Sequence, residues 1–120
     1  MARSLVAAQP AAVGRLPEVG EHYRRLAEYL VGTGSPDQLA MALRTFPQAA
    51  PVTDREALRR VRAPVLVVGQ PDDPLHPLEV AKELAELLPA GQLHVLSSPD
   101  ALWSGRAEVR AVLTEFFGEH

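Results

Sequence analysis

Ala63-Pro64-Val65-Leu66-Val67-Val68-Gly69 is the stretch that decides the fold. Four consecutive apolar residues, three of them β-branched, end at a glycine and predict a strand that is buried on both faces. Proline is allowed at the first residue of a strand, so Pro64 fits the same interpretation. Strands of this kind belong to parallel sheets covered by helices, and the stretch therefore predicts an α/β fold.

The residues after this strand predict a helix, a second strand and a closing helix. A helix is expected over about 77–88, where apolar residues recur at helical spacing until Pro89 and Gly91 stop it. Leu93-His94-Val95-Leu96 predicts a short strand, and five apolar residues predict the last helix (Val109, Val112, Leu113, Phe116 and Phe117). A strand–helix–strand unit favours parallel pairing, so we expect a two-stranded parallel sheet with two open edges.

Helices are also predicted before the first strand. Pro17 is a favourable first helical residue, and apolar residues recur from there until Gly32 and Gly34. The stretches 35–38 (Ser-Pro-Asp-Gln) and 53–56 (Thr-Asp-Arg-Glu) have the pattern of capping boxes and predict further helix starts. We therefore divide the chain into a disordered or frayed N-terminus (1–16), a helical segment (17–61) and a C-terminal strand–helix–strand–helix unit (62–120).

Composition and charge exclude several classes of function. A net charge of −3 argues against a nucleic-acid surface, which needs a basic field. The absence of cysteine excludes disulfides, thiolate zinc sites and cysteine nucleophiles. Gln9 and Pro10 interrupt the apolar stretch 5–8, which is too short for a secretory signal, and no apolar run is long enough to span a membrane. We predict a cytoplasmic protein that binds neither nucleic acid nor membrane.

The segment from Val61 to Phe117 resembles the C-terminal end of the α/β-hydrolase superfamily. Residues 61–69 are similar to the penultimate strand of that family, and Asp73-Pro74-Leu75-His76-Pro77 to the turn that bears its catalytic acid. Residues 93–96 and the helix ending at Phe117 resemble the final strand and closing helix, and residues 17–61 resemble the inserted cap. The resemblance implies a partial α/β-hydrolase-like sheet preceded by a helical cap-like segment. It also implies a parent that hydrolyses an ester or a similar small-molecule bond.

Asp73 is the candidate catalytic acid, with Asp72 as the alternative. Side chains at the C-terminal ends of parallel strands face the crevice where α/β sheets bind ligands, and a carboxylate there can orient an imidazole. The resemblance places the acid at Asp73, but the gap after Gly69 is one residue longer than the family pattern, which keeps Asp72 open. Aspartate and proline are also favoured in turns, so a purely structural role stays open too.

No histidine stands where the resemblance implies the catalytic base. That base follows the last strand in the family, whereas here Asp100 or Ala101 stands near the position, in the stretch 97–103. An aspartate paired with another carboxylate needs a large pKa shift to act as a base. We expect His76 to cap a helix or line a cleft, His94 to point to one sheet face, and His22 to be solvated, while His120 is terminal. Trp103 is expected to anchor the core rather than to form a pocket wall.

A nucleophile is also missing from the sequence. The elbow motif Gly-x-Ser-x-Gly has its nearest match in residues 32–36, which lack the closing glycine and lie between two predicted helices. Asp72, Asp73 and His76 make a poor metal set, and we predict neither a metal nor a cofactor. Two functions follow. The chain is either a hydrolase-like fragment or remnant, inactive alone, or a binding or structural module that pairs with a partner chain or itself through open sheet edges.

Overall fold

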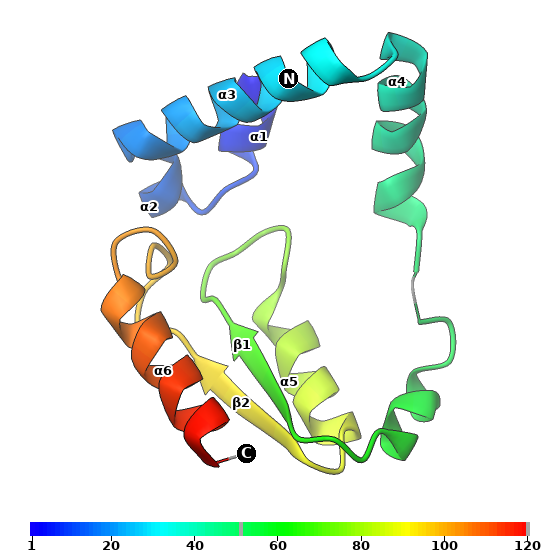
Figure 1. Cartoon of the computed structure of the whole chain (residues 1–120), viewed down its shortest axis with the longest axis vertical. Coiled ribbons are helices and arrows are strands. Elements are labelled where there is room, and N and C mark those ends of the chain that lie inside the picture. Colours follow the sequence, from blue (N-terminus) through cyan, green and yellow to red (C-terminus); the bar gives the residue numbers. More distant parts are fainter. Residues whose placement is uncertain (51, 120) are drawn as a thin grey trace.

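A two-stranded parallel sheet with helices forms the C-terminal part of the chain, which is a partial α/β fold as predicted (Figure 1). The computed structural model describes residues 1–50 and 52–119, so Pro51 and His120 lie outside the described residues. Strand β1 (Val65–Gly69) pairs with β2 (Gly91–Val95), so that Val65 lies opposite Gly91. Helix α5 (Leu78–Leu87) connects the two strands and packs against both.

The two faces of the sheet are covered by different helices. On the α5 face, the Cα of Gly69 approaches the helix so closely that an added Cβ would lie 2.5 Å from Leu78 Cδ1. Helix α6 (Arg106–Glu119) lies on the other face, where Val112 and Phe116 stand beside Leu66 and His94. Helices lie on both faces of the sheet, but β1 is less buried than its apolar pattern predicted: Val65, Leu66 and Val67 are half-buried and Val68 is 40% exposed. Two strands and two helices do not enclose the strand completely.

Helix α6 is packed on only part of its predicted apolar stripe. Val109, Val112 and Phe116 are half-buried, whereas Leu113 and Phe117 are exposed. The stripe is therefore wider than the surface that two strands can cover. The helix is also anchored by Glu108, which accepts hydrogen bonds from the Ser97 N–H (3.0 Å) and hydroxyl (2.6 Å).

The N-terminal residues are helical, in place of the frayed terminus that we expected. Helices α1 (Ala2–Ala7) and α2 (Ala11–Gly14) precede the long helix α3 (Pro17–Thr33), and α1 packs along α3. Val13 and Val19 are fully buried there. Burial of these side chains stabilises the short helices, whose local helix propensity alone is too weak to form them.

The predicted capping boxes form only in part. Ser35 is the N-cap of α4 (Pro36–Thr45), but its side chain makes no capping hydrogen bond. After the 3₁₀ turn η1 (Phe46–Gln48), the second box starts one residue later than predicted, at Asp54 rather than Thr53. The Asp54 carboxylate accepts the Glu56 N–H at 3.1 Å and begins a 3₁₀ helix, η2 (Arg55–Arg60), because aspartate caps as well as threonine does.

The buried core is small and lies in two places. Val13 and Val19 belong to the N-terminal helices, while Leu87, Leu96 and Ala101 belong to the C-terminal unit. Apolar side chains in and after α4 stay exposed: Leu43 of the helix is 51% exposed, and Phe46, which directly follows it, is 74% exposed. In Figure 1, α4 lies on the right, on the opposite side of the picture from α6.

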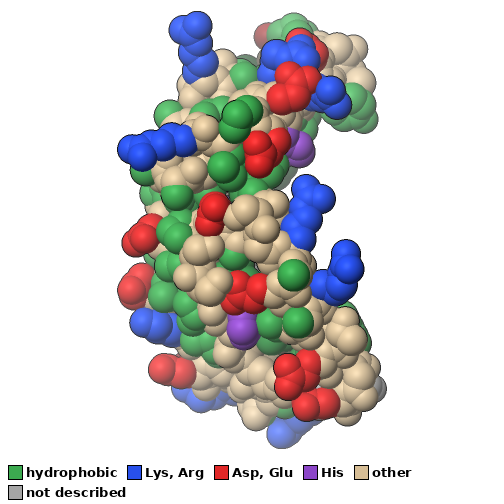
Figure 2. All heavy atoms as spheres, turned by 90° about the vertical axis from the view of Figure 1, so that its left-hand side faces the viewer, with side chains coloured by type: hydrophobic (Ala, Val, Ile, Leu, Met, Phe, Trp, Pro, Cys, Tyr) green, Lys and Arg blue, Asp and Glu red, His purple; other side chains and the backbone are tan. Residues whose placement is uncertain are grey.

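The face of the molecule drawn in Figure 2 carries both acidic and basic side chains rather than one charged field. Figure 2 shows both kinds interspersed with hydrophobic side chains over the face that it presents. Within residues 1–50 and 52–119, no helix is both long and apolar enough to cross a membrane.

Candidate functional site

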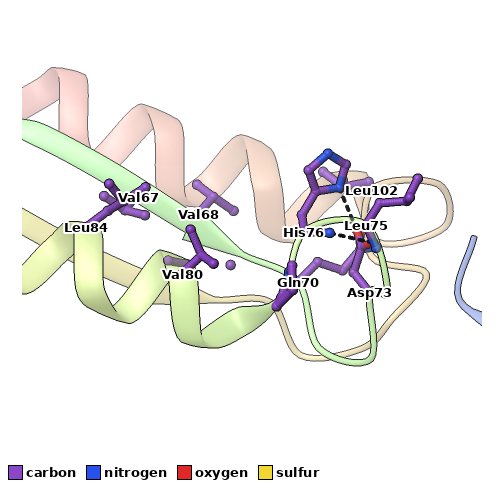
Figure 3. Close-up of a pocket in the computed structure, with 12 residues that line it drawn as sticks. Val67, Val68, Gln70, Asp73, Leu75, His76, Val80, Leu84 and Leu102 are labelled. Atoms are coloured by element: carbon purple, nitrogen blue, oxygen red, sulfur yellow. Dashed lines mark hydrogen bonds and ion pairs between the residues drawn. The ribbon is translucent and has the colours of Figure 1, made fainter. Parts of the chain in front are cut away.

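Asp73 lies in the loop that follows β1, at the C-terminal end of the sheet. Its Oδ1 accepts the N–H groups of Leu75 (2.9 Å) and His76 (3.1 Å), and its Oδ2 lies 3.0 Å from the Nδ1 of His76 (Figure 3). The carboxylate-bearing side chain is 10% exposed and the imidazole side chain 82% exposed. The loop therefore fixes the carboxylate and presents the other ring nitrogen of His76 outward.

The surroundings of Asp73 favour its charged form. Partial burial raises the pKa of this carboxyl, but the hydrogen bonds from the His76 ring and from the N–H groups of Leu75 and His76 outweigh burial. The net result is a pKa below the usual value of an aspartate. A carboxylate that is charged at neutral pH and bonded to Nδ1 is the arrangement that orients an imidazole in hydrolytic triads.

The geometry supports both interpretations of Asp73. Its hydrogen bonds stay within its own loop, as the turn interpretation predicts. The same residue also lines a cavity of about 530 Å³ together with Leu102 and Trp103, which belong to the loop after β2. The two loops meet at the end of the sheet where both strands terminate, as expected for neighbouring parallel strands. A catalytic role for Asp73 stays a prediction.

Asp72 is placed differently from its neighbour. It has a φ of 53°, a left-handed conformation that aspartate tolerates in turns, and it is exposed to solvent. It does not line either of the cavities that Asp73 lines. The geometry therefore favours Asp73 over the alternative.

The loop after β2 carries no imidazole, and its aspartate is engaged locally. The Asp100 carboxylate accepts the hydroxyls of Ser98 and Ser104, both at 2.7 Å. These hydrogen bonds lower the pKa of Asp100, which makes it a still weaker base. The loop therefore holds Asp100 in local hydrogen bonds and has no imidazole at the position where the resemblance implies one.

The cavity also contains side chains of α3 that the sequence did not point to. Tyr23 and His22 line it, and the His22 ring meets the Trp103 ring edge-on at 5.4 Å. Burial raises the pKa of Tyr23, and the negative charge of Asp73 adds to this effect. No local pattern indicates this arrangement, because it depends on α3 lying over the strand ends (Figure 1).

Two expectations about single residues are corrected by this cavity. Trp103 is half-buried and forms part of the cavity wall, not a core anchor. His22 is exposed as expected, but its ring contacts the C-terminal unit instead of being only solvated. His94 points to the α6 face as predicted, with its Nε2 3.1 Å from Glu108.

Metal-binding groups do not gather at this site. Across the part of the chain that the structure describes, no three histidine, cysteine, aspartate or glutamate side chains are grouped to hold an ion. What the described residues bring together here is a carboxylate–imidazole pair and a cavity partly lined by Tyr23 and Trp103.

Comparisons with known proteins give one partial similarity. No family model matches the chain, and no solved structure matches it. The homoserine O-acetyltransferase of Salinibacter ruber is 50% identical to it over 44 residues, which are 37% of this chain and 12% of that protein. The aligned stretch thus spans a small part of the relative. The similarity is compatible with a hydrolase-like relationship of the aligned residues.

The Asp73–His76 pair makes a prediction about the imidazole tautomer. We expect ¹⁵N NMR at neutral pH to show His76 with its proton on Nδ1, because the Asp73 carboxylate accepts it. In Asp73→Asn the two N–H bonds can persist but this preference should disappear, with a stability loss below about 1 kcal/mol because the His76 ring is exposed. His94, which pairs with Glu108, is the internal control and should not change.

The same pair predicts a pH dependence. Since the pKa of Asp73 is lowered in the folded chain, its contribution to stability is present above the ordinary aspartate pKa. That contribution is lost as the pH falls through the folded-state pKa of Asp73.

For the tautomer prediction, an Nδ1-protonated His76 that is unaffected by Asp73→Asn would show that the pair does not form in solution.

Proposed function

We propose that this chain is a fragment or remnant of an α/β-hydrolase-like protein whose parent hydrolysed an ester or a similar small-molecule bond, and that the chain alone is inactive. The observation that carries the proposal is Asp73. It follows a half-buried parallel strand, is itself 10% exposed, and holds a histidine by its Nδ1. Residues 17–61 then correspond to the cap and residues 62–120 to the end of the catalytic domain.

The 44-residue similarity supports the same parentage. The relative's name states an acetyl transfer, and transfer of an acyl group to an alcohol or to water can use one nucleophilic chemistry. We infer that the parent of this chain handled an acyl group. Asp73 would have been the acid that oriented the base, in line with the resemblance of residues 73–77 to the acid turn.

Inactivity of the isolated chain follows from the missing partners of Asp73. The sequence holds no Gly-x-Ser-x-Gly, Ser35 is the N-cap of α4, and the loop after β2 offers Asp100 in place of a base. A carboxylate without a nucleophile has nothing to activate. The chain is then a non-catalytic descendant, or one part of an enzyme.

An activated-ester assay tests the proposal. We expect purified chain to hydrolyse p-nitrophenyl acetate no faster than the buffer background, and Asp73→Asn to give the same rate. Asp72→Asn serves as the matched control, because its side chain lies outside the cavities that Asp73 lines. Turnover that survives removal of contaminating esterases, and that is lost in Asp73→Asn but kept in Asp72→Asn, would refute the proposal that the chain is inactive.

A second candidate function rests on the edges of the sheet. In the described structure β1 and β2 form the whole sheet, so each has one side without a neighbouring strand. Open edges are templates for pairing with another chain. This observation supports a binding or structural module that pairs with a partner chain or itself.

A further inference from the structure

The outer edge of β1 carries backbone groups that no strand of the described structure pairs. The Val65 N–H donates to Ala90, and the Leu96 N–H donates to Gly69. These bonds show that residues 65, 67 and 69 direct their backbone groups toward β2. Because successive residues of a strand alternate in this respect, Leu66 and Val68 direct their N–H and C=O groups to the opposite, open side.

The side-chain pattern of β1 is that of a central strand. Its residues are Val-Leu-Val-Val-Gly, without a charge or proline, and the strand contains no bulge in its pairing with β2. Natural edge strands usually carry a charge, a proline or a bulge, which hinders pairing with another chain. β2 alternates polar Gln92 and His94 with apolar residues, a pattern that suits a true edge. The missing neighbour therefore belongs beside β1.

A groove follows the open edge of β1. It has a volume of about 370 Å³ and is lined by Val67 and Val68 of the strand, by Val80 and Leu84 of α5, and by the loop of Asp73 (Figure 3). Val68 and Val80 are each 40% exposed. Apolar side chains thus stand on both sides of the unpaired backbone groups, as they would around a paired strand.

Gln70 gives independent support for a missing neighbour. This residue directly follows β1, lines the same groove and is only 8% exposed. Its Oε1 has no hydrogen-bond partner among the described residues. A buried acceptor without a donor is costly, and a donor brought by another segment would remove that cost.

We infer that the outer edge of β1 accepts a parallel strand from a second polypeptide. The inference rests on the proposed function, because it treats the sheet as an incomplete one. The partner segment is about five residues long to match β1, apolar and β-branched, and belongs to an α/β sheet. It pairs with the N–H and C=O groups of Leu66 and Val68 and places a donor near Gln70.

A second copy of this chain fits the edge less well. Two copies related by a two-fold axis would pair their β1 strands antiparallel. The doubly apolar pattern of β1 is typical of parallel sheets instead. In addition, the alignment covers 12% of the Salinibacter relative. A protein of that length has enough residues outside the alignment to form further strands.

Two proline variants separate the edges. Val68→Pro removes an N–H that points to the open side and leaves the β1–β2 ladder intact, since proline is tolerated where the N–H faces solvent. Val95→Pro makes the same change on the outer side of β2, at a residue of nearly equal exposure (39% against 40%). Circular dichroism checks that both variants keep the wild-type fold.

The probe is the Salinibacter acetyltransferase with its 44 aligned residues deleted, mixed with this chain and followed by light scattering after size exclusion. We expect a 1:1 complex, weakened at least about tenfold by Val68→Pro and less than about twofold by Val95→Pro. Hydrogen exchange should show that the amides of Leu66 and Val68 become protected in the complex, which gives a readout independent of the variants.

Other outcomes overturn the inference. Absence of a complex with a probe that circular dichroism shows to be folded, a complex that Val95→Pro weakens instead, or a homodimer that Val68→Pro dissociates would each contradict the inference. The last result would assign the edge to a second copy. Because these readouts are mass and exchange, they are distinct from ester turnover by the isolated chain, which is the result that would refute the proposed function.

Discussion

Leu87→Ala is expected to destabilise the C-terminal unit by about 2–4 kcal/mol. Leu87 is the buried residue of α5, at 8% exposure, and α5 is the helix that packs against both strands. The described core holds few other buried apolar side chains. Few side chains can therefore move into the cavity that alanine would leave. Urea unfolding followed by circular dichroism measures the change.

Val80→Ala is the matched control for Leu87→Ala. Val80 lies on the same helix but is 40% exposed beside the open groove, so its truncation should cost less than about 1 kcal/mol. Equal losses for the two variants would mean that α5 does not pack on the sheet as described.

Gly91→Ala should cost about 1–3 kcal/mol, although alanine is the smallest possible addition. Gly91 begins β2 where the strand passes closely under the end of α5. An added Cβ would lie 2.5 Å from the carbonyl oxygen of Ala85 and 2.9 Å from the Cβ of Leu88. The first of these is a backbone atom, which cannot move away without shifting the helix. Thermal unfolding of the variant measures the loss.

Gly20→Ala provides the opposite expectation within the same chain. Gly20 lies inside α3, and nothing comes within 4 Å of a Cβ added there. Alanine should therefore stabilise the helix by about 0.5–1 kcal/mol. A Gly91→Ala variant as stable as wild type would contradict the close approach of α5 and β2.

The C-terminal unit could be predicted from its sequence because local and tertiary signals agree there. The run Val65–Val68 has one stable solution, a strand covered on both faces, and the helix after it has clear stops at Pro89 and Gly91. The structure places the strands at 65–69 and 91–95 in parallel, as expected. Asp73 lies at the end of β1 because the strand fixes where its loop begins.

The N-terminal part was less predictable, because its structure depends on contacts made far along the chain. Residues 2–7 and 11–14 have no strong helix signal, and they are helical where α1 packs on α3 and Val13 is buried. The participation of His22 and Tyr23 in the cavity has the same origin. The two residues are consecutive in the helix, where neighbours point about 100° apart, so their spacing did not indicate a common site. Only the position of α3 over the strand ends brings both to the cavity of Asp73 and Trp103.

The position of His76 could be predicted from the motif only in part. The sequence predicted a helix-capping or cleft-lining residue, and the structure has it both in a cavity wall and bonded to Asp73. Spacing of three residues in a proline-rich turn allowed this pair but did not require it. The pair forms because the Asp73 carboxylate also accepts two backbone N–H groups, which fixes its orientation toward the ring.

We propose that this chain keeps the acid of a hydrolase-like site but has no nucleophile of its own. Intact-mass spectrometry after incubation with a fluorophosphonate, which modifies activated serines, tests it most directly. We predict that the folded chain keeps its unmodified mass while a serine hydrolase in the same tube is fully labelled. A stoichiometric adduct on any serine of this chain, lost on unfolding, would contradict the claim.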